Sequence, residues 1–170
     1  MCGKSLRANM LFFFHGLESG PHGSKYHLMK AVHPELQAPD FQGMDLAQRL
    51  AVAEQETRGL SGVTLVGSSF GGLLAARLYS LYPERFKSLL LLAPAVHTEE
   101  GEQVSEMPPA SRVRVIHGNA DEVVPHDKVA DFCKRFGIQL ITVADSHRLA
   151  AEGSQDMILS ALSDIYSTRN

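Results

Sequence analysis

The sequence predicts an α/β fold, with a mostly parallel sheet of five to six strands, helices on both faces and no cap domain. Three observations support this prediction. Five short runs of apolar, branched or aromatic residues recur along the chain, and helical patterns lie between them. The 170 residues, of which 44% are hydrophobic, can bury one substantial core but have little material for a second. We therefore expect a single domain over residues 1–170, with parallel strands joined by helical crossovers.

The predicted elements follow one another in a regular order. Strands are expected at residues 10–14, 63–66, 89–92, 113–116 and 138–143, where unbroken apolar runs are typical of buried parallel strands. A weaker run at 36–41 contains Pro39, so it would lie at an edge of the sheet if it forms a strand. Helices are expected at residues 24–32, 45–58, 70–82, 126–136 and 153–166.

The helix expected at 45–58 has an amphipathic pattern. Leu46, Leu50 and Ala53 form its apolar stripe, whereas Gln48 and Arg49 are expected to face water. The later segment 95–111 is rich in Glu and Pro and has no clear period. We interpret this segment as a surface connection, with a loop that covers the site as the alternative.

Composition and charge exclude several classes of function. A formal net charge of −3 without a long basic run gives no electrostatic basis for binding nucleic acid or an anionic membrane. Cys2 and Cys133 are too few for a disulfide framework and lack the spacing of a zinc site, so both are expected to be free thiols. The apolar run from Met10 is too short for a signal sequence or a membrane span, which favours the cytoplasm. Small molecules or neutral acyl groups are the expected partners, and the oligomeric state stays open.

The strongest functional signal is the motif Gly67-Ser68-Ser69-Phe70-Gly71. It follows a predicted strand and precedes a predicted helix, which is the setting of a nucleophile elbow. Such a sharp turn requires small residues two positions before and two after the nucleophile, and Gly67 and Gly71 supply them. The alternative is a plain connection or a phosphate-binding loop, but the motif lacks the Gly-Lys-Ser/Thr ending and the dinucleotide spacing. The pattern therefore predicts Ser69 as a nucleophile.

A serine nucleophile needs a base that takes its proton and an acid that orients the base. Asp121 follows the strand expected at 113–116, and His147 follows the strand expected at 138–143. Ser69, Asp121 and His147 therefore stand in the chain order that accompanies a nucleophile elbow. The sequence predicts these three residues as a catalytic triad.

Other side chains compete for the roles of base and acid. His147 is preferred over His117 and His126 because it follows the last strand, at the carboxyl edge where sites of open α/β sheets form. Glu122 and Asp145 are rivals of Asp121 as the acid. Asp145 lies two residues before His147 and could orient it, so the choice of acid stays open at this stage.

The oxyanion of a tetrahedral intermediate needs two N–H donors. One is expected from Phe70, directly after the nucleophile, and the other from Leu17, in the loop that follows the first strand. Gly16 allows that loop to turn, and His15 is interpreted as a structural residue bonded to the loop backbone. Ser24 is expected to cap the following helix.

Several motifs taken together are characteristic of one known group. They are His15-Gly16-Leu17-Glu18-Ser19 with Ser24-Lys25, Val66-Gly67-Ser68-Ser69-Phe70-Gly71-Gly72, Ala93-Pro94-Ala95-Val96, His117-Gly118-Asn119-Ala120-Asp121-Glu122-Val123-Val124 and Ser146-His147. Over nearly its whole length the chain resembles the small bacterial YqiA-like esterases of the α/β-hydrolase superfamily. This resemblance implies an esterase or thioesterase for short acyl groups, with Ser69, Asp121 and His147 as the triad and without a cofactor or metal.

The chain departs from that group in one loop. The group usually has glycine and asparagine before the histidine, whereas this chain has Ala144-Asp145-Ser146-His147. The departure makes Asp145 a reserve acid. We expect a serine hydrolase that cleaves short acyl carboxylic esters through an acyl-enzyme. The alternatives are an acyl thioesterase or serine peptidase with the same triad, or a hydrolase fold that serves as a non-catalytic binding module.

Overall fold

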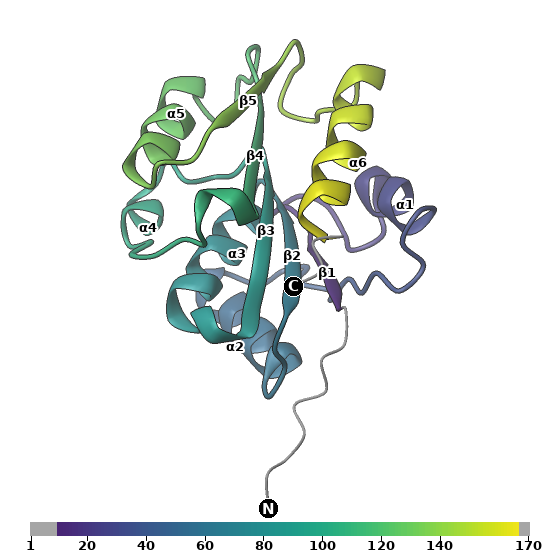
Figure 1. The fold of residues 1–170 in the computed structure, drawn as a ribbon, viewed down its shortest axis with the longest axis vertical. Helices are drawn as coiled ribbons and strands as arrows, with labels where there is room; N and C mark the ends of the chain where they lie inside the picture. The colour runs from purple at the N-terminus through teal and green to yellow at the C-terminus, as the bar shows by residue number, and fades with distance from the viewer. Residues whose placement is uncertain (1–9, 167–170) are drawn as a thin grey trace, which may run out of the picture.

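Among the residues that the structure describes, 10–166, five strands form one parallel sheet (Figure 1). The structure is a computed structural model. The strands are β1 Leu11–Phe14, β2 Val63–Ser68, β3 Phe86–Leu92, β4 Val113–Gly118 and β5 Leu140–Val143. They lie side by side in chain order, and each neighbouring pair is parallel. The predicted parallel α/β fold is confirmed.

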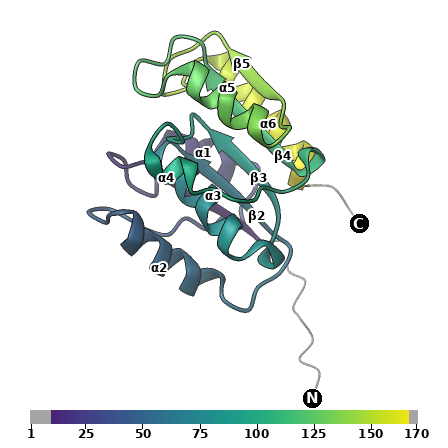
Figure 2. The ribbon, with the colours of Figure 1, turned by 90° about the vertical axis from the view of Figure 1, so that its left-hand side faces the viewer.

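Helices cover both faces of this sheet (Figures 1 and 2). They are α1 Ser24–Lys30, α2 Leu46–Thr57, α3 Phe70–Leu81, the short α4 Glu99–Glu102, α5 His126–Arg135 and α6 Glu152–Tyr166. Because β1 to β5 follow one another across the sheet, crossovers of one hand place α2 to α5 on the same face. Helices α1 and α6 cover the other face. No helix within residues 10–166 is long and apolar enough to cross a membrane.

Alternation along β1 divides the core into two layers. Phe12 and Phe14 pack into the cluster beneath α2, α3 and α5, whereas Leu11 and Phe13 pack into the cluster beneath α1 and α6. The strand is an edge strand, but its side chains are buried in these two layers, and Gln37 pairs with its outer edge through a single bridge. The weak strand expected at 36–41 is therefore reduced to this bridge, at the predicted edge.

Strand β5 forms the other edge of the sheet and differs from the prediction. It begins at Leu140, and its side chains are half-buried or exposed. The prediction of a buried strand at 138–143 is wrong in this respect: β5 is an edge strand with an exposed residue at Thr142, whereas the segment at Gln37 pairs with the opposite edge of the sheet. In the sequence, the apolar run of an edge strand can look like that of a central strand. Both kinds of strand place side chains against the helix layers on the two faces of a parallel sheet.

The start of α1 also differs from the prediction. Ser24 is the first residue of α1, the cap position is Gly23, and no side chain caps this helix. Helix α2 has instead a full capping box: the Asp45 carboxylate accepts the Gln48 N–H at 2.8 Å, and the Gln48 side chain accepts the Asp45 N–H at 3.0 Å. The box satisfies two N–H groups at the start of α2 and so defines where this helix begins.

The segment 95–111 packs against α3 and α5. The Arg135 guanidinium of α5 donates to the Gly101 carbonyl at 3.0 Å, and the Ser80 hydroxyl of α3 donates to the Glu106 carbonyl at 2.9 Å. Gly101 lies so close to its neighbours that an added Cβ would be 2.1 Å from a backbone oxygen. These contacts fit the interpretation of a surface connection.

Cys133 is buried in α5 and is a free thiol, as expected. Burial raises its pKa to about 12, so it remains protonated and acts as a packing group. Cys2 lies outside the described residues.

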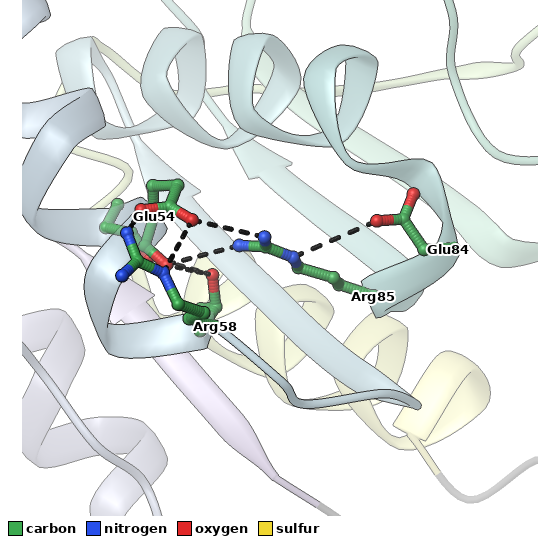
Figure 3. Close-up of polar contacts among 6 residues, drawn as sticks. Glu54, Arg58, Glu84 and Arg85 are labelled. Atoms are coloured by element: carbon green, nitrogen blue, oxygen red, sulfur yellow. Dashed lines mark hydrogen bonds and ion pairs between the residues drawn. The ribbon is translucent and has the colours of Figure 1, made fainter. Parts of the chain in front are cut away.

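An ion-pair network joins α2 to the turn before β3 (Figure 3). The Glu54 carboxylate contacts Arg58 at 2.6 Å and Arg85 at 3.2 Å, and Arg85 also lies 3.9 Å from Glu84. Arg85 is in the short 3-10 turn Pro83–Arg85 at the amino end of β3. The network therefore fixes α2 at the end of the sheet opposite to the predicted site.

Glycine at position 71 is required by a close backbone contact. An added Cβ would lie 2.0 Å from the Phe14 carbonyl oxygen, which belongs to the backbone and cannot rotate away. We expect Gly71→Ala to lower the free energy of unfolding by at least about 2 kcal/mol, measured by urea denaturation. Gly153→Ala is the matched control, because no atom lies within 4 Å of its added Cβ. Equal midpoints for the two variants would contradict this packing.

Candidate active site

Ser69 occupies the sharp turn between β2 and α3. Its φ of 55° and ψ of −115° are costly for a residue with a side chain. Hydrogen bonds hold this backbone: the Ser69 N–H donates to the Leu92 carbonyl at 2.8 Å, and its carbonyl accepts the Ala95 N–H at 2.9 Å. An added Cβ at Gly67 would lie 2.3 Å from the Gly71 oxygen, so the turn tolerates only glycine there. The local geometry is that of a nucleophile elbow.

The structure brings Ser69, His147 and Asp121 together. The Ser69 hydroxyl lies 2.9 Å from His147 Nε2, and His147 Nδ1 lies 2.7 Å from Asp121 Oδ2. The three residues follow the carboxyl ends of β2, β5 and β4, as expected for an open parallel sheet. An ionised carboxylate only accepts hydrogen bonds, so Nδ1 carries the proton and Nε2 is free to accept the serine proton.

Asp121 is fully buried and is held by backbone donors. Its Oδ1 accepts the N–H groups of Val123 and Val124, each at 2.8 Å. Burial raises the pKa of this carboxyl, but the hydrogen bonds from Val124, His147 and Val123 together outweigh burial and lower the pKa below its usual value. Asp121 is therefore a carboxylate at neutral pH.

Asp145, the rival acid, has a different role. Its Oδ2 accepts the Ser154 hydroxyl at 2.6 Å and the Ala151 N–H at 2.9 Å, at the start of α6. The bond from Ser154 is the main cause that lowers its pKa. Asp145 therefore anchors α6 beneath the histidine loop, and Asp121 is the acid in contact with His147. Glu122, the second rival, is exposed.

Neither neighbouring histidine takes the place of His147, although His117 Nε2 lies 3.4 Å from Asp121 Oδ2. His117 is buried, and its Nε2 donates to the Val124 carbonyl at 2.9 Å. Burial is the main cause that lowers its pKa, so the ring is neutral. His126 shares a hydrogen bond of 2.9 Å with Thr142. Within residues 10–166, no group of three or more His, Cys, Asp or Glu side chains is placed to bind a metal ion.

The two predicted oxyanion donors belong to segments that lie next to Ser69. An added Cβ at Gly16 would be 3.6 Å from the Ser69 Cβ, so the loop that carries Leu17 runs beside the nucleophile. Phe70 is the first residue of α3, where N–H groups have no carbonyl partner in a preceding turn and the helix dipole is positive. Both predicted donors therefore belong to the edge of the sheet at which Ser69, His147 and Asp121 meet.

His15 is structural, as interpreted from the sequence. Its Nδ1 donates to the Gly16 carbonyl at 2.8 Å, and its Nε2 accepts the Phe41 N–H at 2.8 Å. Burial is the main cause that lowers its pKa, which is consistent with a neutral ring. His15 thus links the loop that follows β1 to the segment between α1 and α2.

Arg49 contradicts the prediction that it faces water, because its side chain is 0% exposed. Its Nη1 donates to the His15 carbonyl at 2.8 Å, and its Nη2 donates to the Gly16 carbonyl at 3.1 Å. Burial lowers the pKa of this guanidinium, which stays protonated because arginine titrates far above neutral pH. Position 49 is three residues after Leu46 and four before Ala53, so the helical period alone places it on the core face.

Lys25 was not assigned a contact from the sequence. Its ammonium group donates to the Arg148 carbonyl at 2.7 Å, directly after His147. This contact joins α1 to the histidine loop across more than a hundred residues of sequence. The sequence alone gives no sign of this contact, because only the tertiary fold brings Lys25 and Arg148 together.

A model of the alpha/beta hydrolase fold family matches residues 15–111, which is more than half of the chain. The chain belongs to the α/β-hydrolase fold family. The match includes Ser69 and the loop that carries Leu17 but ends before Asp121 and His147. The assignment of Asp121 and His147 is therefore supported by their geometry in this α/β-hydrolase and not by the family match.

Solved structures show the same fold. A Xanthomonas campestris protein described as a hydrolase of the alpha/beta superfamily has 24% identity and a TM-score of 0.71, over 92% of this chain and 94% of its own. Est1E from Butyrivibrio proteoclasticus, also solved with ferulic acid bound, has 18% identity and a TM-score of 0.68, with coverage of 91% and 88%. Mouse alpha/beta hydrolase domain-containing protein 10 has 18% identity and a TM-score of 0.73, with coverage of 91% and 88%. A comparison with curated proteins finds no match.

The backbone at Ser69 gives a prediction about stability. Glycine adopts a positive φ at no steric cost, whereas alanine keeps the Cβ that makes this conformation costly. We expect the free energy of unfolding of Ser69→Gly to exceed that of Ser69→Ala by about 1 kcal/mol. This difference already includes the loss caused by the greater entropy of glycine in the unfolded chain. Urea denaturation of the two variants measures this difference. A Ser69→Ala variant as stable as Ser69→Gly would show that the elbow carries no strain.

Proposed function

We propose that this α/β-hydrolase is a serine hydrolase that cleaves short acyl carboxylic esters through an acyl-enzyme on Ser69. The observation that carries the proposal is the hydrogen-bonded chain from Ser69 through His147 to Asp121, with distances of 2.9 and 2.7 Å. In a neutral imidazole, the Asp121 carboxylate holds the proton on His147 Nδ1, so that Nε2 faces the Ser69 hydroxyl as an acceptor. Membership of the family and the elbow geometry of Ser69 support the same proposal.

In the proposed reaction, Ser69 Oγ attacks the ester carbonyl carbon while its proton passes to His147 Nε2. The buried Asp121 carboxylate stabilises the imidazolium that forms. The leaving alkoxide takes the proton from Nε2 as the carbon–oxygen ester bond breaks, which leaves the acyl group on Ser69. A water molecule, deprotonated by His147, then attacks the acyl carbon, and the acid leaves as Ser69 regains its proton.

The negative oxygen of each tetrahedral intermediate would accept hydrogen bonds from the N–H groups of Phe70 and Leu17. Donors fixed in advance, one of them at the positive end of α3, stabilise this charge without reorganisation. Removal of one such donor costs about 10²- to 10³-fold in kcat in serine hydrolases. The oxyanion site is therefore a large part of the proposed rate enhancement.

The surroundings of Ser69 suit a small acyl ester. His147 is 21% exposed, so water can reach the acyl-enzyme. Leu17 and Val123, each 59% exposed, place apolar side chains on the two loops that carry the oxyanion donor and the acid. We propose that the protein is a YqiA-like esterase. Because the similar protein Est1E has been solved with ferulic acid bound, esters of aromatic acids are also substrates to test.

The direct test is hydrolysis of p-nitrophenyl butyrate by the wild type and by Ser69→Ala. We expect the substitution to lower kcat by at least about 10⁴-fold, since the nucleophile is lost. Ser68→Ala is the matched control, because it removes the adjacent hydroxyl and leaves the triad intact. Hydrolysis by Ser69→Ala at the wild-type rate would overturn the proposal. Rates on methyl ferulate, a butyryl thioester and a peptide, measured side by side, separate an esterase from a thioesterase or peptidase.

Substitution of the two candidate acids distinguishes their roles. Asp121→Asn is expected to lower kcat by about 10⁴-fold, because an amide no longer holds His147 in the required tautomer. Asp145→Asn is expected to keep kcat close to that of the wild type and to lower stability, because it weakens the anchoring of α6. The measurements are kcat on p-nitrophenyl butyrate and the urea midpoint. The reverse order of activities would identify Asp145 as the acid.

A further inference from the structure

Arg49 is a buried cation whose hydrogen-bond partners are backbone carbonyls. Besides the bonds to the His15 and Gly16 carbonyls at 2.8 and 3.1 Å, its Nε donates to the Met44 carbonyl at 3.3 Å. Among the ion pairs of the described residues, none includes Arg49. Asp40 attracts this charge only from beyond ion-pair distance. A buried guanidinium whose direct partners are all backbone carbonyls is expensive, and an apolar residue would fill this place on α2 at a lower cost. The guanidinium therefore requires a functional explanation.

The geometry of the peptide bond supplies that explanation. The Gly16 carbonyl and the Leu17 N–H belong to one planar trans peptide, so they point in opposite directions. The Gly16 oxygen is held by two donors, Arg49 Nη2 at 3.1 Å and His15 Nδ1 at 2.8 Å. With the oxygen fixed toward Arg49, the Leu17 N–H is fixed toward the opposite side. Gly16 lies beside Ser69, so this orientation decides whether the amide can serve the oxyanion.

Arg49 also contacts the second donor residue. Its guanidinium carbon lies 4.8 Å from the centre of the Phe70 ring and 5.5 Å from that of Phe41. The Phe41 N–H in turn donates to His15 Nε2, which closes a set of contacts around the loop. A single side chain of α2 therefore contacts the Phe70 ring and the carbonyl of the peptide that carries the Leu17 N–H.

We propose that Arg49 is a positioning residue for the oxyanion site: it fixes the Gly16–Leu17 peptide and places a positive charge behind it. This inference rests on the proposed function. A charged donor polarises the peptide and strengthens the opposite N–H as a donor. Since negative charge develops on the substrate oxygen only in the tetrahedral state, Arg49 acts on kcat rather than on KM.

Two substitutions separate geometry from packing. Arg49→Met keeps an apolar stem but loses the donors and the charge, whereas Arg49→Lys keeps the charge and loses the planar fork that spans two carbonyls. With p-nitrophenyl butyrate, we expect kcat to fall by about 10²-fold for Arg49→Met and by about 10-fold for Arg49→Lys, with KM nearly unchanged. The affinity for 1-butaneboronic acid, which forms a tetrahedral adduct with a serine nucleophile, should fall by similar factors.

Arg85→Met is the matched control for loss of a mostly buried arginine on the same face of the sheet. Arg85 bonds to Glu54 at 3.2 Å, at the opposite end of α2 from the oxyanion loop (Figure 3). We expect this variant to lose stability but to keep the wild-type kcat and boronate affinity. The urea midpoint of every variant is measured alongside.

The inference is overturned if Arg49→Lys keeps the wild-type kcat and the wild-type affinity for the boronic acid. This variant alone provides the test if Arg49→Met does not fold. A loss of kcat in Arg85→Met equal to that in Arg49→Met overturns it as well, because the effect then follows stability alone. Failure of the proposed function is distinct. In that case the wild-type protein itself neither hydrolyses the ester nor binds the boronic acid.

Discussion

The first turn of α3 and the carboxyl end of β1 meet at a backbone contact that leaves no room for a side chain. The Cα of Gly71, in the first turn of α3, lies so close to the Phe14 carbonyl that a Cβ would be 2.0 Å from its oxygen. The contact holds the start of α3 against the loop that leaves β1. Ser69 and the Gly16–Leu17 peptide are brought together by the same approach. The packing of α3 on β1 and the geometry of the proposed oxyanion site therefore depend on the same contact. A change in one also changes the other.

Much of this arrangement can be predicted from the sequence because it depends on local rules. A strand, a glycine-flanked serine and a helix specify the elbow at Ser69, and the order of acid and base follows from the carboxyl ends of later strands. The burial of β1 and the exposure of β5 do not follow from composition, since they depend on which segment covers each edge. A bridge from Gln37 covers one edge, whereas β5 has β4 as its one neighbour in the sheet.

The least predictable features are polar groups whose partners are distant in sequence. Arg49 stands in the apolar stripe of α2, but its charge favours a solvent-exposed interpretation unless the loop carbonyls that receive its hydrogen bonds are known. Asp145 and Asp121 cannot be ranked by spacing, because only the tertiary fold shows Asp145 engaged with Ser154 and the start of α6. In both cases a polar side chain is explained by the backbone groups that it satisfies. These groups support the edge of the sheet on which Ser69 lies.

The central claim is that Ser69 becomes acylated because His147, oriented by the buried Asp121, removes its proton. The most direct measurement is the intact mass of the protein during turnover of p-nitrophenyl butyrate, quenched in acid and followed by peptide mapping. The account predicts one butyryl group on Ser69, which accumulates with a burst of nitrophenol to the extent that deacylation is slower than acylation. That adduct should be absent when His147 is replaced by alanine. A butyryl group on another residue, or acylation of Ser69 at the same rate in His147→Ala, would contradict the account.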